Sequence, residues 1–135
     1  ITADDNGLTG IRNLSQPKGL TESTNPIIKE TIKQLAEYFQ GDRKEFSIPL
    51  SFGGTDFQRS VWEALLQIPY GKTTTYSQVA VSIDRPKAIR AAGTAIGRNP
   101  IPIIIPCHRV IATNGGLGGF AWGLEVKKKL LDREQ

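Results

Sequence analysis

The segment TYSQVAVSIDRPKAIRAAGTAIG, residues 75–97, decides the fold that we expect for this chain. Apolar residues recur at helical spacing on both sides of the turn Asp84-Arg85-Pro86. The first half predicts a short helix over about residues 75–83, and the second half predicts a helix that begins at Pro86 and ends near Gly97. Two short helices joined by a brief turn are typical of a helix-turn-helix.

The second of these helices is built largely from small residues, which are Ala88, Ala91, Ala92, Gly93 and Ala95. One interpretation is close packing against a neighbouring helix. The other is that the helix presses its backbone into a narrow groove, such as the minor groove of DNA. A helix that binds in the major groove displays Arg, Asn or Gln to the base edges. Only Lys87 and Arg90 precede Arg98 here, which favours the minor groove.

The charge distribution also suits a polyanionic partner. The 135 residues include 17 Lys or Arg and 13 Asp or Glu, a net charge of +4. Residues 1–57 hold six basic and eight acidic side chains, whereas residues 58–135 hold eleven and five. The C-terminal part is therefore the basic part, and we expect any nucleic-acid contact there.

Composition excludes several classes of protein. The single cysteine rules out an intramolecular disulfide framework and any zinc site built from several cysteines. No run approaches the roughly 18 consecutive apolar residues of a membrane span. No signal peptide precedes Ile1, and the missing initiator Met suggests that the chain begins downstream of its true start. We therefore expect a reduced intracellular compartment, the cytoplasm or, in a eukaryote, the nucleus.

The N-terminal part predicts short strands. Residues 1–13 predict a hairpin around Asp4-Asp5-Asn6-Gly7, and residues 15–24 predict a polar linker. Apolar and other residues alternate over residues 46–52, which predicts a further short strand before the Gly-Gly pair at 53–54.

Two amphipathic helices have clear start signals. Asn25 followed by Pro26 predicts the start of one helix, which Gly41 ends. Thr55 and Gln58 form a possible capping box at the start of the other. The predicted apolar faces are Ile28, Ile32, Leu35 and Phe39 for the first, and Phe57, Val61, Trp62, Leu65 and Leu66 for the second.

The C-terminal third alternates between irregular and regular structure. Three prolines forbid a helix over residues 99–106, while residues 110–112 predict a brief strand and residues 123–134 a closing helix. We therefore expect an α/β fold with two parts. Residues 1–50 would form a small N-terminal lobe with short strands and one helix, and residues 51–135 a mainly helical domain with the helix-turn-helix and the cysteine loop.

The candidate chemistry lies in residues 103–110, IIIPCHRV. The only cysteine and the only histidine of the chain, Cys107 and His108, are adjacent there and are followed by Arg109. A thiol becomes a strong nucleophile when a histidine or a nearby cation lowers its pKa. In a helical turn the two side chains can share a bridging water. The alternative is an inert buried cysteine beside a surface histidine.

Pro106-Cys107-His108-Arg109-Val110 resembles the active-site signature of the O6-alkylguanine-DNA alkyltransferases, a family of DNA repair methyltransferases. The resemblance is strong from about Phe46 to Glu134 and loose before that. Further matching segments occur in the same order as in the family: 54–58 with Val61-Trp62, 68–71, Thr75-Tyr76, 86–91, 98–100, 118–121 and 127–134.

The resemblance implies direct reversal of O6-alkylguanine, and also of O4-alkylthymine, in duplex DNA after base flipping. Cys107 would take the alkyl group by in-line displacement, irreversibly, so that the protein acts once. His108 would act as a base through a water and Glu134 would hold its imidazole. Tyr76 would donate a hydrogen bond to the leaving purine, and Asn99 would brace the turn before the active-site loop.

The resemblance also assigns the DNA contacts. Arg90 would fill the stack vacated by the flipped base, Ile89 and Ala91 would line the minor groove, and Lys87 and Thr75 would contact DNA. The guanine pocket would be formed by Val110, Pro102, Phe120, Ala121 and Trp122. A monomer without cofactor, metal or membrane association is implied.

Two departures from the family pattern matter. Some relatives bind zinc through Cys and His in the N-terminal lobe, but this chain has only Cys107 and His108. Phe120 stands where Tyr is common, and Trp122 where Gly is common, so we expect the indole to narrow the pocket and to obstruct O6-benzylguanine. The alternative function is a non-catalytic DNA-binding module whose cysteine senses oxidation or alkylation.

Overall fold

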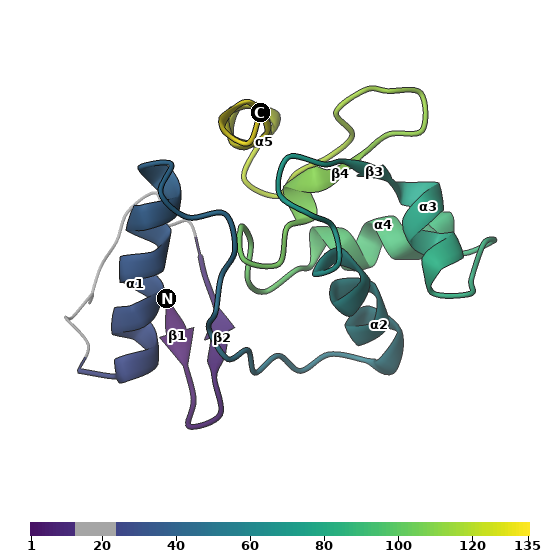
Figure 1. The fold of residues 1–135 in the computed structure, drawn as a ribbon. Helices are drawn as coiled ribbons and strands as arrows, with labels where there is room; N and C mark the ends of the chain where they lie inside the picture. Colours follow the sequence, from purple (N-terminus) through teal and green to yellow (C-terminus); the bar gives the residue numbers. More distant parts are fainter. Residues whose placement is uncertain (13–23) are drawn as a thin grey trace. The chain divides into compact units, whose positions relative to one another are not determined.

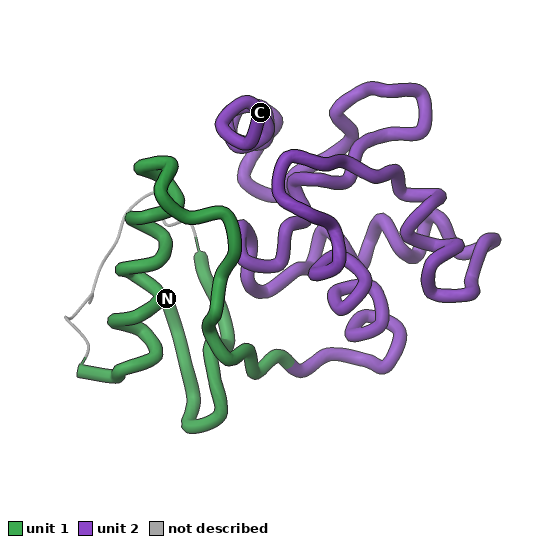
Figure 2. Tube along the Cα trace, viewed as in Figure 1, with its two compact units in different colours: residues 1–52 green, residues 53–135 purple. Residues whose placement is uncertain are grey.

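The computed structural model describes residues 1–12 and 24–135 and divides into two compact units, Ile1–Phe52 and Gly53–Gln135 (Figures 1 and 2). Apart from Thr24, the linker predicted over residues 15–24 lies outside the described residues. Within the described part of the chain, no helix has the length and apolar character needed to cross a membrane.

The first unit begins with the predicted hairpin. Strand β1, Thr2–Ala3, pairs antiparallel with strand β2, Leu8–Gly10. The carboxylate of Asp4 accepts hydrogen bonds from the backbone N–H groups of Asn6 at 2.8 Å and Gly7 at 3.0 Å. An aspartate that binds the backbone two and three residues ahead stabilises a tight turn, which explains why the hairpin forms here.

Helix α1, Pro26–Phe39, starts where the sequence predicts. The Asn25 side chain accepts from the backbone N–H of Ile27 at 2.8 Å and of Ile28 at 3.3 Å, and Pro26 occupies the first turn. Such a cap satisfies N–H groups that have no partner inside the helix.

The predicted apolar face of α1 was wrong at two of its four positions, and the other two, Ile28 and Leu35, are half-buried. The buried residues are Thr31, Gln34 and Tyr38, whereas Ile32 and Phe39 of the predicted face Ile28, Ile32, Leu35 and Phe39 are 55% and 43% exposed. The amide of Gln34 donates to the Ser47 hydroxyl at 3.1 Å and accepts from the Ser47 N–H at 3.0 Å. A polar side chain can occupy the interior when its hydrogen bonds are satisfied, and a count of apolar residues does not detect this.

The strand predicted over residues 46–52 is reduced to a single bridge. Leu50 pairs in parallel with Leu8, with backbone hydrogen bonds from the Leu8 N–H to Pro49 and from the Ser51 N–H to Leu8, each 2.8 Å. Burial alternates along this segment as expected. Proline has no N–H to donate, so Pro49 keeps the ladder from extending.

Three helices organise the second unit: α2 (Asp56–Leu65), α3 (Tyr76–Ser82) and α4 (Ile89–Gly97) pack against one another (Figure 1). The capping box predicted at the start of α2 is present, with Thr55 and Gln58 bonded reciprocally. Trp62 of α2 donates from its indole Nε1 to the Ala95 carbonyl of α4 at 2.8 Å. This buried bond couples α2 to α4.

Helix α4 begins at Ile89 and not at Pro86 as predicted. The Ala88 N–H donates to the Arg85 carbonyl at 2.9 Å, so residues 85–88 form a turn between α3 and α4. Ala88 lacks a capping side chain. A proline tolerates the first position of a helix, but it equally suits the second position of a turn, and here the turn forms.

The small residues of α4 divide between its buried and its exposed sides, so close packing is observed and groove binding stays a prediction. Ala92 and Ala95 are at most 2% exposed and allow close helix packing. Ala91 is exposed, and Gly93 is half-buried with its Cα facing the ring of Tyr76, where a Cβ would lie 3.7 Å away.

After α4 the chain has no regular structure until the 3-10 helix η1, Cys107–Arg109. Strand β4, Val110–Ile111, then pairs in parallel with β3, Thr74–Thr75. Ile103 adopts a positive φ of 74°, which is rare and strained for a β-branched side chain. Backbone strain of this kind persists only where the surroundings enforce it, and here it lies four residues before the cysteine.

Helix α5, Leu124–Arg133, closes the chain and contacts η1 (Figure 1). The expected fold class is confirmed: an α/β chain with a small strand-containing N-terminal unit and a mainly helical C-terminal unit.

Candidate active site

Cys107 is held at the start of η1 by a braced turn. Its side chain is buried, with 6% of the residue exposed. The Asn99 amide donates from Nδ2 to the Ile105 carbonyl at 2.8 Å and accepts at Oδ1 from the Ile101 N–H at 2.9 Å. Asn99 therefore ties the two ends of the turn together immediately before the cysteine.

The environment of Cys107 favours the neutral thiol. Burial is the largest effect and raises the thiol pKa, while the Asn99 side chain and the charge of Lys127 act in the opposite direction. Since the pKa is raised overall, the thiol is protonated at neutral pH. Only the thiolate is a strong nucleophile, so the site needs a base.

His108, which follows Cys107 in η1, is the residue predicted to act as that base. Its ring is fully buried, and its Nε2 lies 2.7 Å from Oε2 of Glu134. A carboxylate accepts only, so Nε2 carries a proton, and in the neutral imidazole the lone pair is then on Nδ1. Among the described residues, Nδ1 has no hydrogen-bond partner, which means that imidazole and thiol are not bonded directly. The water-bridged contact expected from the sequence stays a prediction.

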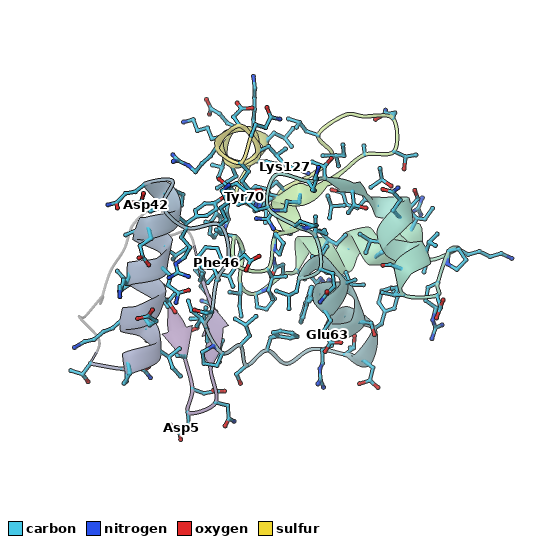
Figure 3. All side chains as sticks on the ribbon, in the orientation of Figure 1. Asp5, Asp42, Phe46, Glu63, Tyr70 and Lys127 are labelled. Atoms are coloured by element: carbon cyan, nitrogen blue, oxygen red, sulfur yellow. The ribbon has the colours of Figure 1, made fainter. Side chains whose placement is uncertain are left out.

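Arg109 is a member of the site whose contacts the sequence did not reveal. Its Nε donates to Oε1 of Glu134 at 2.7 Å and its Nη2 to Oε2 at 3.0 Å, a bidentate ion pair. Its Nη1 donates to the Ile68 carbonyl at 2.7 Å, and its guanidinium lies 5.7 Å from the ring centre of Tyr70, which Figure 3 labels. Only its place in the motif beside His108 hinted at this role.

Tyr76, at the start of α3, contacts the loop that contains Gly118 and Gly119. Its hydroxyl accepts from the Gly119 N–H at 3.3 Å and donates to the Gly119 carbonyl at 3.4 Å. Gly118 has a φ of +72°, and a Cβ on it would lie 2.8 Å from the Tyr76 ring. Glycine is therefore required at 118 for the loop to approach the phenol.

A small cavity of about 80 Å³ lies over the thiol. The predicted pocket residues Pro102, Phe120, Ala121 and Trp122 line it. The predicted catalytic residues Tyr76, Asn99 and Cys107 line it as well. The rings of Phe120 and Trp122 meet edge to face, 6.2 Å apart. Val110, also predicted for the pocket, is fully buried outside the lining, and its carbonyl accepts from Lys127.

The sequence missed several lining residues, which are Gly93, Ile96, Gly97 and Gly119. The first three belong to α4, whose small residues were considered only for helix packing and for DNA. The period of α4 would have placed Gly93 and Gly97 on one face, four residues apart.

The predicted DNA-contacting residues lie on the outer surface of the second unit. Ile89, Arg90 and Ala91 are exposed at the start of α4, and Lys87 is exposed in the preceding turn. Thr75 is different, because its hydroxyl caps α3 by accepting from the Gln78 N–H at 3.2 Å. Within the described residues there is no group of three or more Cys, His, Asp or Glu side chains that could hold a metal ion.

Comparison with known proteins identifies the family. Residues 56–135 match the model of the 6-O-methylguanine DNA methyltransferase, DNA binding domain, and residues 1–52 match that of its ribonuclease-like domain. The chain belongs to the 6-O-methylguanine DNA methyltransferase family. The family resemblance stated from the sequence is therefore confirmed.

Individual relatives are similar over most of the chain. The methylated-DNA--protein-cysteine methyltransferase of Methanosarcina barkeri is 48% identical over 95% of this chain and 80% of its own. Mycobacterium tuberculosis OGT in complex with DNA superposes with a TM-score of 0.86 at 44% identity, over 98% of this chain and 83% of its own. S. pombe Atl1 in complex with DNA containing O6-carboxymethylguanine has a TM-score of 0.54 at 30% identity, over 61% of this chain and 79% of its own.

The pKa of Cys107 makes its reactivity depend on pH in a defined direction. Because the thiol pKa is raised, alkylation of Cys107 by iodoacetamide should continue to accelerate with rising pH after the rate of an unstructured cysteine peptide has levelled off. The measurement is the rate of carbamidomethylation by mass spectrometry between about pH 6 and pH 10. A rate for Cys107 that levels off at lower pH than the peptide would contradict the neutral resting thiol.

Proposed function

We propose that this protein repairs O6-alkylguanine in DNA by transferring the alkyl group to Cys107. The observation that carries the proposal is a buried thiol at the floor of a small cavity, beside a histidine whose one free nitrogen is available as a base. The similarity to methylated-DNA--protein-cysteine methyltransferases supports it. In the reaction Sγ forms a bond to the alkyl carbon, the bond from that carbon to O6 breaks, and the electron pair passes to the purine.

Proton movement accounts for the buried polar groups. The thiol proton passes through a water to Nδ1 of His108, and the resulting imidazolium is stabilised by Glu134 at 2.7 Å. Arg109 already neutralises much of the charge of Glu134, which keeps the carboxylate ionised and fixed in the interior. Glu134 therefore orients the imidazole, and Arg109 orients Glu134.

The leaving purine needs a proton or a hydrogen bond. Tyr76 lines the cavity that Cys107 also lines, and its hydroxyl is the donor best placed to stabilise charge on the departing guanine. The hydroxyl is bonded to Gly119 at 3.3 Å and 3.4 Å, which are long contacts that a purine nitrogen can replace. The thioether product is stable, so each molecule acts once.

The substrate base has to leave the duplex. An alkyl group on O6 cannot be reached in line within a stacked helix, so the nucleotide is flipped. The exposed start of α4 with Ile89 and Ala91 suits the minor groove, and Arg90 is a planar cation that can fill the vacated stack. O4-alkylthymine carries the same kind of exocyclic alkoxy group, and we include it as a second substrate.

Intact-mass measurement tests the transfer. After incubation with a duplex that contains O6-methylguanine, the protein should gain one methyl group, which peptide mapping places on Cys107, and the duplex should contain restored guanine. Cys107→Ser should gain no mass and should still bind the duplex, because binding rests on α4 and the basic side chains. A parallel incubation with O4-methylthymine duplex tests the second substrate.

Binding without a gain of mass by the unaltered protein would contradict transfer. It would support the alternative function, a DNA-binding module with a sensing cysteine, for which the similarity to S. pombe Atl1 is the favouring observation.

Arg90→Ala tests base flipping. The variant should repair duplex O6-methylguanine about five- to 150-fold more slowly, because one stacking contact of roughly 1–3 kcal/mol is lost, while its rate with the free base O6-methylguanine stays unchanged. Single-turnover rates on both substrates are compared, with Arg98→Ala, also at an exposed position, as the matched control. Equal losses on the duplex and on the free base would assign Arg90 to the pocket chemistry instead.

A further inference from the structure

Lys127 is a fully buried lysine that the proposed reaction does not use. It lies on α5 and is 0% exposed. Figure 3 labels it between α5 and the segment that carries η1 and β4. Its Nζ donates to three backbone carbonyls, those of Val110 at 2.6 Å, Gly119 at 3.0 Å and Leu117. An ammonium group has three N–H donors, so all of them are used.

One acceptor lies in the strand before the pocket loop, and the other two lie in the loop itself. Val110 starts β4, and Leu117 and Gly119 belong to the pocket loop, by which we mean residues 112–122. The pocket loop supplies one wall of the cavity over Cys107 through Gly119, Phe120, Ala121 and Trp122. Lys127 thus joins β4, which precedes the loop, to the part of the loop that forms the wall.

The Gly119 carbonyl receives two donors, Lys127 Nζ at 3.0 Å and the Tyr76 hydroxyl at 3.4 Å. The shorter bond comes from the charged donor, and charge-assisted bonds are the stronger ones. With Gly119 held by Lys127, the Tyr76 hydroxyl can exchange its weak contact for a substrate without release of the loop. Lys127 also lies 5.9 Å from the centre of the Tyr76 ring.

The energetics favour a specific role over a generic packing role. Within the described residues, Lys127 forms no ion pair with a carboxylate. A buried cation without a counter-charge is expensive unless hydrogen bonds compensate for the lost hydration. The three carbonyls supply that compensation only in this loop conformation, so displacement of the loop would leave the ammonium unsatisfied.

The charge of Lys127 also reaches the nucleophile. It lowers the pKa of the Cys107 thiol against the larger effect of burial, and a Cys107 thiolate in turn raises the pKa of Lys127, which burial lowers. A cation that holds the loop therefore also favours formation of the thiolate.

We propose that Lys127 is a positioning residue that fixes the pocket loop over Cys107 and so sets the substrate cavity for alkyl transfer. This inference rests on the proposed function for its kinetic consequence, but the contact between Lys127 and the loop can be tested without it. The groups that Lys127 aligns are the Gly119 backbone and, through it, the hydroxyl of Tyr76.

The test compares Lys127→Met with Lys128→Met, the neighbouring exposed lysine of the same helix. Methionine keeps the length of the side chain but donates no hydrogen bond, so the three carbonyls lose the donor that holds the loop. In Lys127→Met, hydrogen exchange of the amides of residues 117–120 should accelerate about tenfold or more, while amides of α2 stay protected. Lys128→Met should leave both unchanged.

Kinetic measurements separate positioning from simple damage to the fold. Methyl transfer from duplex O6-methylguanine should slow about tenfold or more in Lys127→Met, whereas iodoacetamide should still reach the same limiting rate with Cys107 at high pH. The midpoint of the iodoacetamide profile should move to higher pH, because a cation near the thiolate is gone. If Lys127→Met does not fold, Lys127→Gln takes its place.

Unchanged exchange of the pocket loop in the variant would overturn the proposal, as would the failure of both variants to fold, since Lys127 would then be required for the core. Faster loop exchange with an unchanged transfer rate would overturn the positioning role. A protein that transfers no methyl group in its unaltered form would instead contradict the proposed function, and the exchange experiment would still report on the loop contact.

Discussion

The buried carboxylate of Glu134 is the constraint on which the site of the second unit depends. It stands at the end of α5, with 4% of the residue exposed, and accepts from His108 and twice from Arg109. A carboxylate is tolerated in such a place only when it is paired and fully hydrogen-bonded. The same contacts fix α5 to η1, and Arg109 extends the connection to the Ile68 carbonyl after α2. Removing one partner would leave a charge uncompensated in the interior.

The proposed chemistry depends on the nitrogen of His108 that Glu134 does not bind. With Nε2 of His108 committed to Glu134, the only nitrogen available for proton transfer is Nδ1, which has no partner among the described residues. The thiol beside it is neutral at rest because burial raises its pKa. Cys107 lines a cavity of about 80 Å³, whereas His108, the proposed base, is buried and is not among the residues that line it. Ligand pockets usually measure roughly 300–1,000 Å³, so the cavity suits a small group such as a methyl and has to widen for a whole base.

Signals between neighbouring residues predicted much of the fold. Polar contacts between residues far apart in the sequence were not predicted. The caps at Asn25 and Thr55 and the hairpin after Ala3 depend on neighbouring residues, and all three form as predicted. The buried face of α1 was missed because Gln34 is satisfied by Ser47, 13 residues away. The start of α4 was misplaced because Pro86 suits a turn as well as a helix.

The same limit applies to the site. Cys107 and His108 stood out because each is the only residue of its type, and Glu134 was assigned from family resemblance. Lys127 looked like one of 17 basic side chains, and only the place of Arg109 in the motif hinted at its role. Their partners are backbone carbonyls and a carboxylate that lie 8 to 41 residues away along the chain, and no pattern of residue types encodes such contacts.

The protonation of the His108 ring tests the central claim most directly. The chain has one histidine, so nitrogen-15 histidine labelling gives the NMR signals of this imidazole alone. The account predicts that the ring of the resting protein carries a proton on Nε2, bonded to Glu134, and none on Nδ1. In Glu134→Gln the preference for the proton on Nε2 should weaken, because an amide can either donate or accept. A proton on Nδ1 in the unaltered protein, or on both nitrogens, would contradict the account, since no base would then stand beside the thiol.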